Sequence, residues 1–175
     1  MSYSVKILAD SLAPCGKRLT TFELTYPRFI HSELLTHRVM SRNSSSSRAI
    51  PNEKLREMIK KDPAMPVFWG KNQSGMQAKE ELISSSLCEA KSSWLEARDL
   101  MLEYSERLAN TGLHKQLCNR IIEPWMFITA VVSATEYSNW FGLRCHEDGQ
   151  PELKFIADEM KKQYDLNDPI KLNVG

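Results

Sequence analysis

Cationic and hydroxyl side chains gather in one short segment, from His37 to Arg48. This segment holds one histidine, three arginines and four consecutive serines at positions 44–47. Arginine forms bidentate, charge-assisted hydrogen bonds with phosphate, while hydroxyls and loop N–H groups satisfy the remaining oxygens. The segment therefore predicts a phosphate-binding loop. A flexible serine linker, or an exposed Arg-x-x-Ser segment that a kinase reads, has the same composition.

A second group of polar residues lies in the C-terminal third and contains Arg120, Asn139 and Arg144. Asn139 and Arg144 are separated by about 140° around a helix, so they can contact two neighbouring ligands but not one small group. Arg144 also follows Trp140 and Phe141 at helical spacing, which places its guanidinium beside an aromatic face. An arginine that packs on surface aromatics looks the same.

The sequence shows no nucleophile, base and acid in series, no glycine-rich phosphate loop and no metal-ligand spacing. The cysteines are far apart and are interpreted as reduced, mostly buried thiols: Cys15, Cys88, Cys118 and Cys145. Cys145 and His146 are neighbours and would point about 100° apart on a helix, which makes a catalytic pair there a poor interpretation. We expect no metal site, so any catalysis must rest on a cofactor and on electrostatics.

Composition predicts one soluble globular domain over residues 1–175. The chain is 42% hydrophobic and 26% charged, with a formal net charge of +1. This balance argues against a stable nucleic-acid partner. Because no apolar run approaches about 20 residues and no signal peptide opens the chain, we expect a cytoplasmic protein without membrane contact. Positive charge is local, since residues 28–48 hold four arginines against Glu33.

Apolar periodicity predicts the elements that position these residues, and together they indicate an α+β fold. An N-terminal hairpin of strands 5–12 and 19–26 precedes a helix to about residue 38, a serine loop over 42–48 and a short helix over 51–59. One long helix covers about 77–110. Its apolar residues recur alternately four and three positions apart and form a seam, which suits a core or a subunit interface. A helix over 113–122, a buried strand over 126–132 and two C-terminal helices follow.

Three motifs occur in the same order as the motifs of a known protein family. In the first, Arg38 is followed by seven residues and then Ser46; the second is Arg120-Ile-Ile-Glu-Pro, and the third runs from Asn139 to Arg144. They resemble the Arg-His-Arg-x7-Ser, Arg-x-x-x-Pro and Asn-Phe-Leu-x-Leu-Arg motifs of the flavin-dependent thymidylate synthases over roughly residues 18–165. Thr36 replaces the first arginine of the signature, which is typical of a divergent, phage-type member.

The resemblance implies a ThyX-like α+β domain that forms a homotetramer, with FAD and a pyrimidine deoxynucleotide held between subunits. By position, the residues that would contact FAD are Thr36, His37, Arg38, Ser44 and Asn139. Those that would hold the nucleotide are Glu33, Ser44, Ser45, Ser46, Ser47, Arg48, Arg144 and, from another subunit, Arg120. Arg144 would be catalytic, because it would face the pyrimidine and favour ionisation at N3.

The same resemblance implies an enzyme of dTMP biosynthesis in a bacterial or phage-infected cytosol. It would transfer a one-carbon unit from methylenetetrahydrofolate to C5 of dUMP, with NADPH reducing the flavin. Three alternatives stay open: a flavin-dependent methylase or hydroxymethylase of dUMP or dCMP, a noncatalytic nucleotide-binding oligomer, and a basic loop that contacts nucleic acid.

Overall fold

A computed structural model describes residues 3–173 of the chain. Its contacts divide them into two compact units. The helical unit contains Pro27–Phe29 and Ser46–Phe127, and the sheet unit contains residues 3–26, Ile30–Ser45 and 128–173. Strands and helices both occur, so the predicted α+β class is confirmed. The prediction of a single domain over residues 1–175 stays a prediction.

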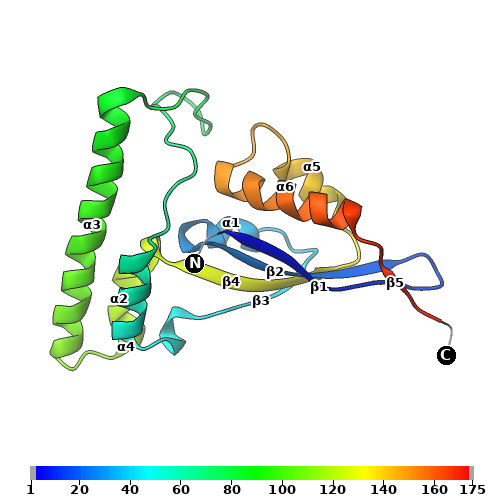
Figure 1. The fold of residues 1–175 in the computed structure, drawn as a ribbon, viewed down its shortest axis with the longest axis horizontal. Helices are drawn as coiled ribbons and strands as arrows, with labels where there is room; N and C mark the ends of the chain where they lie inside the picture. The colour runs from blue at the N-terminus through cyan, green and yellow to red at the C-terminus, as the bar shows by residue number, and fades with distance from the viewer. Residues whose placement is uncertain (1–2, 174–175) are drawn as a thin grey trace. The chain divides into compact units, whose positions relative to one another are not determined.

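The sheet unit is built on the N-terminal hairpin. Strands β1 (Ser4–Leu12) and β2 (Arg18–Pro27) pair antiparallel, and Gly16 in their turn takes a left-handed φ of 81° that favours glycine. The full strand order is β3-β4-β2-β1-β5 (Figure 1), which places the hairpin inside the sheet. Strand β4 (Phe127–Ala134) confirms the predicted buried strand, because every second residue is buried.

Helices α5 (Ser138–Arg144) and α6 (Pro151–Leu166) cover one face of this sheet (Figure 1). Proline opens α6 at its first turn, and the Gln150 side chain accepts a hydrogen bond from the N–H of Leu153 at 2.9 Å. The buried face of α6 contains Leu153, Ile156, Ala157 and Met160 at helical spacing. The short α1 (His31–Leu35) precedes the turn that carries His37.

The helical unit is formed by three helices and two 3-10 turns. They are α2 (Asn52–Lys61), α3 (Ser84–Asn110), α4 (Lys115–Cys118), η2 (Ser47–Ala49) and η3 (Arg120–Trp125), while η1 (Arg28–Ile30) links the end of β2 to α1. Their core contains Leu55, Ile59, Leu102, Ile122, Trp125 and Met126. On α3 only Leu102 and Ser105 are buried within the described chain, so most of the predicted seam stays accessible.

The prediction of a loop over 42–48 is wrong for its first half. Strand β3 (Ser41–Ser44) pairs antiparallel with β4, from Ser41 opposite Ser133 to Ser44 opposite Ala130. Every side chain of β3 is at least partly exposed, so no apolar alternation marks this edge strand in the sequence.

Two helix boundaries and one burial prediction are also wrong. The long helix begins at Ser84 rather than near residue 77, because the preceding backbone pairs with residues 69–71: the N–H of Leu82 donates to the carbonyl of Trp69 at 2.8 Å. Residues 113–122 form α4 and η3 rather than one helix.

The prediction that the cysteines are mostly buried is the wrong burial prediction. Cys15 and Cys88 are exposed, whereas Cys118 is buried. Strand β5 (Ile170–Lys171), parallel to β1, was not predicted.

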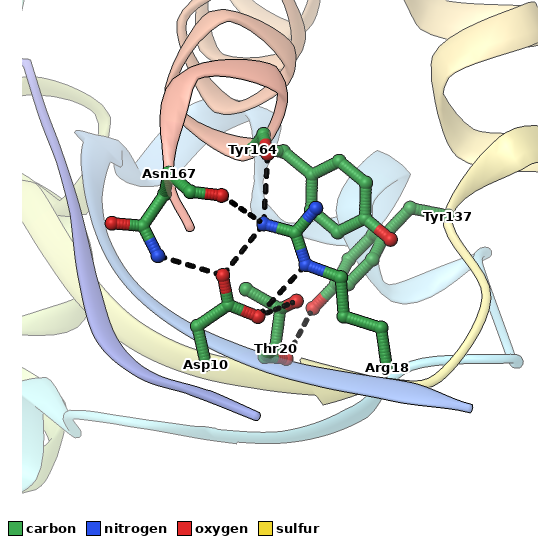
Figure 2. Close-up of polar contacts among 6 residues, drawn as sticks. All are labelled: Asp10, Arg18, Thr20, Tyr137, Tyr164 and Asn167. Carbon is green, nitrogen blue, oxygen red and sulfur yellow. Dashed lines mark hydrogen bonds and ion pairs between the residues drawn. The ribbon is translucent and has the colours of Figure 1, made fainter. Parts of the chain in front are cut away.

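A buried ion pair stabilises the hairpin (Figure 2). Arg18 donates to both carboxylate oxygens of Asp10, at 2.9 and 2.6 Å, and the Asp10 side chain is only 2% exposed. Thr20 and Asn167 donate to the same carboxylate at 2.9 and 2.7 Å. The four donors satisfy a charge that burial would otherwise make costly.

The same arginine holds the C-terminal end of α6. Its Nη2 donates to the carbonyls of Tyr164 and Asn167 at 2.8 and 3.1 Å, and its guanidinium lies 3.8 Å from the Tyr164 ring centroid. Tyr137, which precedes α5, donates its hydroxyl to the Thr20 carbonyl at 3.0 Å (Figure 2). Both helices that cover the sheet are therefore tied to the hairpin.

Replacing Asp10 with alanine should lower the free energy of unfolding by about 3–5 kcal/mol, because it leaves the Arg18 charge without its partner. Burial alone would raise the pKa of the Asp10 carboxyl, but hydrogen bonds from Arg18, Asn167 and Thr20 outweigh it and lower that pKa. The contribution is therefore present above about pH 3.9 and is lost as the pH falls through the lower folded pKa.

Urea unfolding near neutral pH measures this effect. The matched control is Asp165→Ala, which removes a carboxylate from an exposed pair with Lys161 on α6 and should change stability little. Equal unfolding midpoints for the two variants would contradict a stabilising role for Asp10.

No helix within residues 3–173 is both long enough and apolar enough to cross a membrane.

Candidate functional site

The sheet unit contains a cavity between the turn at residues 36–40 and helix α5. Its volume is about 220 Å³, and Thr36, His37, Arg38, Asn139 and Arg144 are among its lining residues. The first half of the predicted phosphate segment and the third motif therefore meet within one unit. Ligand pockets are usually about 300–1,000 Å³, so this cavity alone is smaller than the usual site for a whole cofactor.

His37 is the centre of this cavity wall. Arg144 donates its Nε–H to His37 Nε2 at 2.8 Å, and the Trp140 ring meets the imidazole edge to face, with centroids 4.6 Å apart. Arginine is only a donor, so His37 Nε2 accepts and the imidazole is neutral with its proton on Nδ1. Burial, followed by the charges of Arg144 and Arg42, lowers the pKa of His37 below its ordinary value.

Arg42 fixes the turn that carries His37. Its guanidinium donates to the carbonyls of Leu35 and His37 at 2.8 Å each, and to that of Met40 at 3.2 Å. These bonds use three of the five N–H donors that composition alone would assign to a phosphate. The sequence did not indicate this role, because the acceptors are main-chain carbonyls, which every residue type carries.

Several donors of the cavity remain free for a ligand. The side chains of Arg38 and Asn139 are exposed, and neither they nor the terminal nitrogens of Arg144 form a hydrogen bond with any residue from 3 to 173. The indole nitrogen of Trp140 is buried and has no partner within the same residues. Free amide and guanidinium donors beside a neutral imidazole fit the carbonyl and phosphate oxygens of a flavin nucleotide.

Two predicted binding residues just before the turn, Thr36 and Glu33, take part in hydrogen bonds within their own segment. Thr36 donates its hydroxyl to the carbonyl of Glu33 at 2.7 Å, and Ser32 donates to the Glu33 carboxylate at 2.8 Å. Both Thr36 and Ser32 are exposed, and Glu33 is half-buried. The Glu33 carboxylate can still accept from a ligand, because it has a second oxygen.

Two of the predicted serines, Ser44 and Ser45, belong to the sheet unit and lie on or beside β3. Ser44 Oγ is 3.4 Å from His31 Nε2, and the other ring nitrogen of His31 is 2.8 Å from the hydroxyl of buried Tyr26. Ser45 N donates to the carbonyl of Thr129 at 2.9 Å, which holds the end of β3 against β4. Ser44 and Ser45 are exposed, so their hydroxyls are accessible to a ligand.

The remaining predicted phosphate ligands lie in the helical unit. Ser46 and Arg48 are exposed, and the Arg48 side chain forms no hydrogen bond or ion pair with residues 3–173. Ser47 is buried and donates its hydroxyl to Glu123 Oε1 at 2.6 Å. Arg120 Nη1 lies 3.6 Å from the same oxygen, so the structure brings two predicted ligands to one carboxylate.

The turn that presents Arg48 is held by a residue that sequence reasoning missed. Asn119 is fully buried, and its amide donates to the carbonyls of Ser47 and Ile50 at 2.7 and 3.0 Å. Asn52 in turn donates to Asn119 Oδ1 at 2.9 Å. Asn119 immediately precedes Arg120, and that adjacency to the second motif was the one available signal.

The imidazole of His37 should titrate below about pH 6.5, because burial and two arginines lower its pKa. NMR of the histidine ring protons measures this pKa, and Arg144→Met should move it upward. Since the unfolded chain binds the proton more tightly, the His37 contribution to stability falls as the pH drops through about 6.5. A His37 pKa at or above 6.5 in the parent protein would contradict the arrangement.

A family model described as thymidylate synthase complementing protein, Thy1, matches residues 17–170. The chain belongs to the Thy1 family. This confirms the resemblance carried by the three motifs, and the match includes every predicted site residue of the Thy1 chain. Comparison with curated proteins found no match.

Two solved structures share the Thy1 fold with this chain. One is the UMP/dUMP methylase PolB from Streptomyces cacaoi bound with 5-Br UMP, at 14% identity and a TM-score of 0.72, covering 93% of this chain and 88% of that chain. The other is the same methylase bound with 5-Br dUMP, at 13% identity and a TM-score of 0.74, covering 93% and 90%. At this identity the likeness shows the fold, and it confirms the predicted ThyX-like architecture.

Proposed function

We propose that this protein is a flavin-dependent enzyme that transfers a one-carbon unit from methylenetetrahydrofolate to C5 of dUMP, forming dTMP. Membership of the Thy1 family supports the reaction class. The shared fold of PolB, a UMP/dUMP methylase, supports a uridine nucleotide as substrate. The observation that carries the proposal is Arg144, which is held by a neutral His37 and keeps its terminal nitrogens free at the cavity wall.

Arg144 supplies the electrostatic part of the reaction. A fixed guanidinium beside the pyrimidine stabilises negative charge at N3, and that charge raises the electron density at C5. Its donors are oriented before the substrate arrives, which is the property that makes electrostatic stabilisation effective. Neutral His37 suits this role, since a protonated imidazole would repel Arg144 and could not accept its Nε–H.

The cofactor-binding residues of the proposal are Thr36, His37, Arg38, Ser44 and Asn139. Of these, Arg38 and Asn139 keep free donors that fit flavin oxygens, whereas the Thr36 hydroxyl donates to the Glu33 carbonyl and His37 Nε2 accepts from Arg144. When bound, FAD supplies hydride chemistry that the side chains of the chain lack, with NADPH as the source of the hydride. His37 and Trp140 form a packed wall that keeps water from this side of the cavity.

The nucleotide-binding residues of the proposal are Glu33, Ser44, Ser45, Ser46, Ser47, Arg48, Arg120 and Arg144. They belong to both units, and the cavity of one chain is small for FAD and a nucleotide together. We therefore propose a homotetramer in which a second subunit completes each site and contributes its Arg120. A cytoplasmic location and a phage-type origin belong to the same proposal.

Purified protein tests the proposal through its flavin. We expect a yellow protein, or one that becomes yellow with FAD, which oxidises NADPH faster when dUMP is present. UMP and dCMP should be compared in the same assay, because the fold is shared with an enzyme named for both UMP and dUMP. A protein that binds dUMP but cannot be loaded with FAD would favour the noncatalytic nucleotide-binding alternative.

A further inference from the structure

Asn119 is fully buried and binds the main chain both before and after Arg48. Its amide nitrogen donates to the carbonyl of Ser47 at 2.7 Å and to that of Ile50 at 3.0 Å. These two bonds use both N–H groups of the amide, and its oxygen accepts from Asn52 at 2.9 Å. The three bonds hold the amide in one orientation, and two of them fix the direction of a peptide carbonyl in or beside η2.

Two further donors hold the neighbouring carbonyls of this turn. The N–H of Ala49 donates to the carbonyl of Ser46 at 3.0 Å, and Lys115 Nζ donates to the carbonyl of Ala49 at 3.2 Å. A carbonyl oxygen is an obligatory acceptor with partial negative charge, so it repels an anion unless a protein donor engages it. The turn directs these oxygens at protein donors, while the side chains of Ser46 and Arg48 stay exposed.

A buried polar network holds Asn119 in its turn. The Asn52 amide donates both to Asn119 Oδ1 and, at 2.7 Å, to Ser105 Oγ, and Ser105 donates to the carbonyl of Cys118 at 2.9 Å. Ser105 is fully buried on α3, and in the described part of the chain its hydroxyl has no hydrogen bond to residues 46–50. The network thus contains two buried polar residues of the helical unit, of which only Asn119 binds the turn.

We propose that Asn119 is a positioning residue for the nucleotide phosphate and acts through the turn that presents Ser46 and Arg48; this inference rests on the proposed function. Its amide holds two carbonyl oxygens that would otherwise be free to turn toward a bound anion. The Ser46 hydroxyl and the Arg48 guanidinium therefore meet the phosphate on a main chain that is oriented before the ligand arrives. The competing interpretation makes Asn119 only a stabilising residue of the helical unit, and it predicts lower stability with an unchanged preference for a phosphorylated ligand.

Binding of dUMP and of deoxyuridine to the full-length protein separates the two interpretations. Asn119→Asp keeps the shape of the side chain but replaces its two N–H donors with an oxygen that repels the two carbonyls. The ratio of the dissociation constants, deoxyuridine over dUMP, should fall about 10-fold, because the charged hydrogen bonds to phosphate are weakened. The matched control is Ser105→Ala, which removes a buried polar group of the same network and should lower the thermal unfolding midpoint without changing this ratio.

Asn119→Ser provides a second test that places no charge in the buried site. Serine keeps one donor and is too short to bind both carbonyls, so we expect the ratio to fall about threefold. An unchanged ratio in either folded variant, or an equal fall in Ser105→Ala, would overturn the positioning role of Asn119. If the parent protein itself does not prefer dUMP over deoxyuridine, the proposed function fails instead.

Discussion

Arg144→Ala is expected to lower kcat by at least about 10²- to 10³-fold while leaving the affinity for dUMP nearly unchanged. The loss is that of an oriented donor which stabilises developing negative charge, and such donors are worth this much in other enzymes. Ground-state binding should survive, because the phosphate contacts proposed for Ser47, Arg48 and Arg120 remain. A fall in kcat without a rise in the dissociation constant identifies an interaction made mainly in the transition state.

Steady-state rates of dTMP formation, together with equilibrium binding of dUMP, measure this split. The matched control is Arg107→Ala near the end of α3, which removes an equal charge from a side chain that is 63% exposed. Turnover in Arg144→Ala equal to that of the control would remove Arg144 from catalysis. Parallel losses of rate and affinity would instead assign it to uniform substrate binding.

The second large expected effect is on the binding of the nucleotide phosphate. Arg48→Ala and Arg120→Ala should each weaken dUMP binding by about 1.5–3 kcal/mol, the usual contribution of a charged hydrogen bond. Arg48 has no partner within residues 3–173, so its removal leaves no protein group unsatisfied. For Arg48→Ala the effect should therefore appear in nucleotide affinity and not in stability, whereas Arg120→Ala also removes the 3.6 Å ion pair with Glu123.

Calorimetric titration with dUMP, accompanied by thermal unfolding of each variant, tests this assignment. Arg107→Ala again serves as the control for the loss of one positive charge. Dissociation constants that match the parent in both Arg48→Ala and Arg120→Ala would refute a phosphate site at these arginines. Weaker binding accompanied by an equal loss of stability would indicate a structural role.

Local patterning was sufficient for the elements with a regular apolar face. The hairpin 5–12 and 19–26, the strand over 126–132 and the helix that opens at Pro151 all agree with the structure within a few residues. On β4 every second residue is buried, and on α6 the buried residues lie on one face, so the period of the apolar residues reports these two elements directly. The start of α3 shows the limit, because the absence of glycine and proline over residues 77–83 permits a helix without requiring one.

The candidate site depended on pairings that local patterning cannot supply. Arg144 and His37 are far apart in sequence, and their 2.8 Å hydrogen bond exists because β4 and α5 return the chain to the turn after α1. Arg42 was predicted to bind phosphate, but its guanidinium donates to main-chain carbonyls. Every residue carries such a carbonyl, so the sequence could not indicate this pairing. Residues of the first and third motifs line this cavity, and the hydrogen bonds between them follow from the fold.

The most direct test is a mass spectrum of the nucleotide recovered after incubation with the protein, FAD, NADPH and methylenetetrahydrofolate. Parallel reactions with dUMP, UMP and dCMP distinguish the possible acceptors, and the product mass distinguishes a methyl from a hydroxymethyl group. Our account predicts that dUMP is converted to dTMP and that Arg144→Ala forms none above background. Recovery of all three nucleotides unchanged, from protein that has bound FAD, would contradict it.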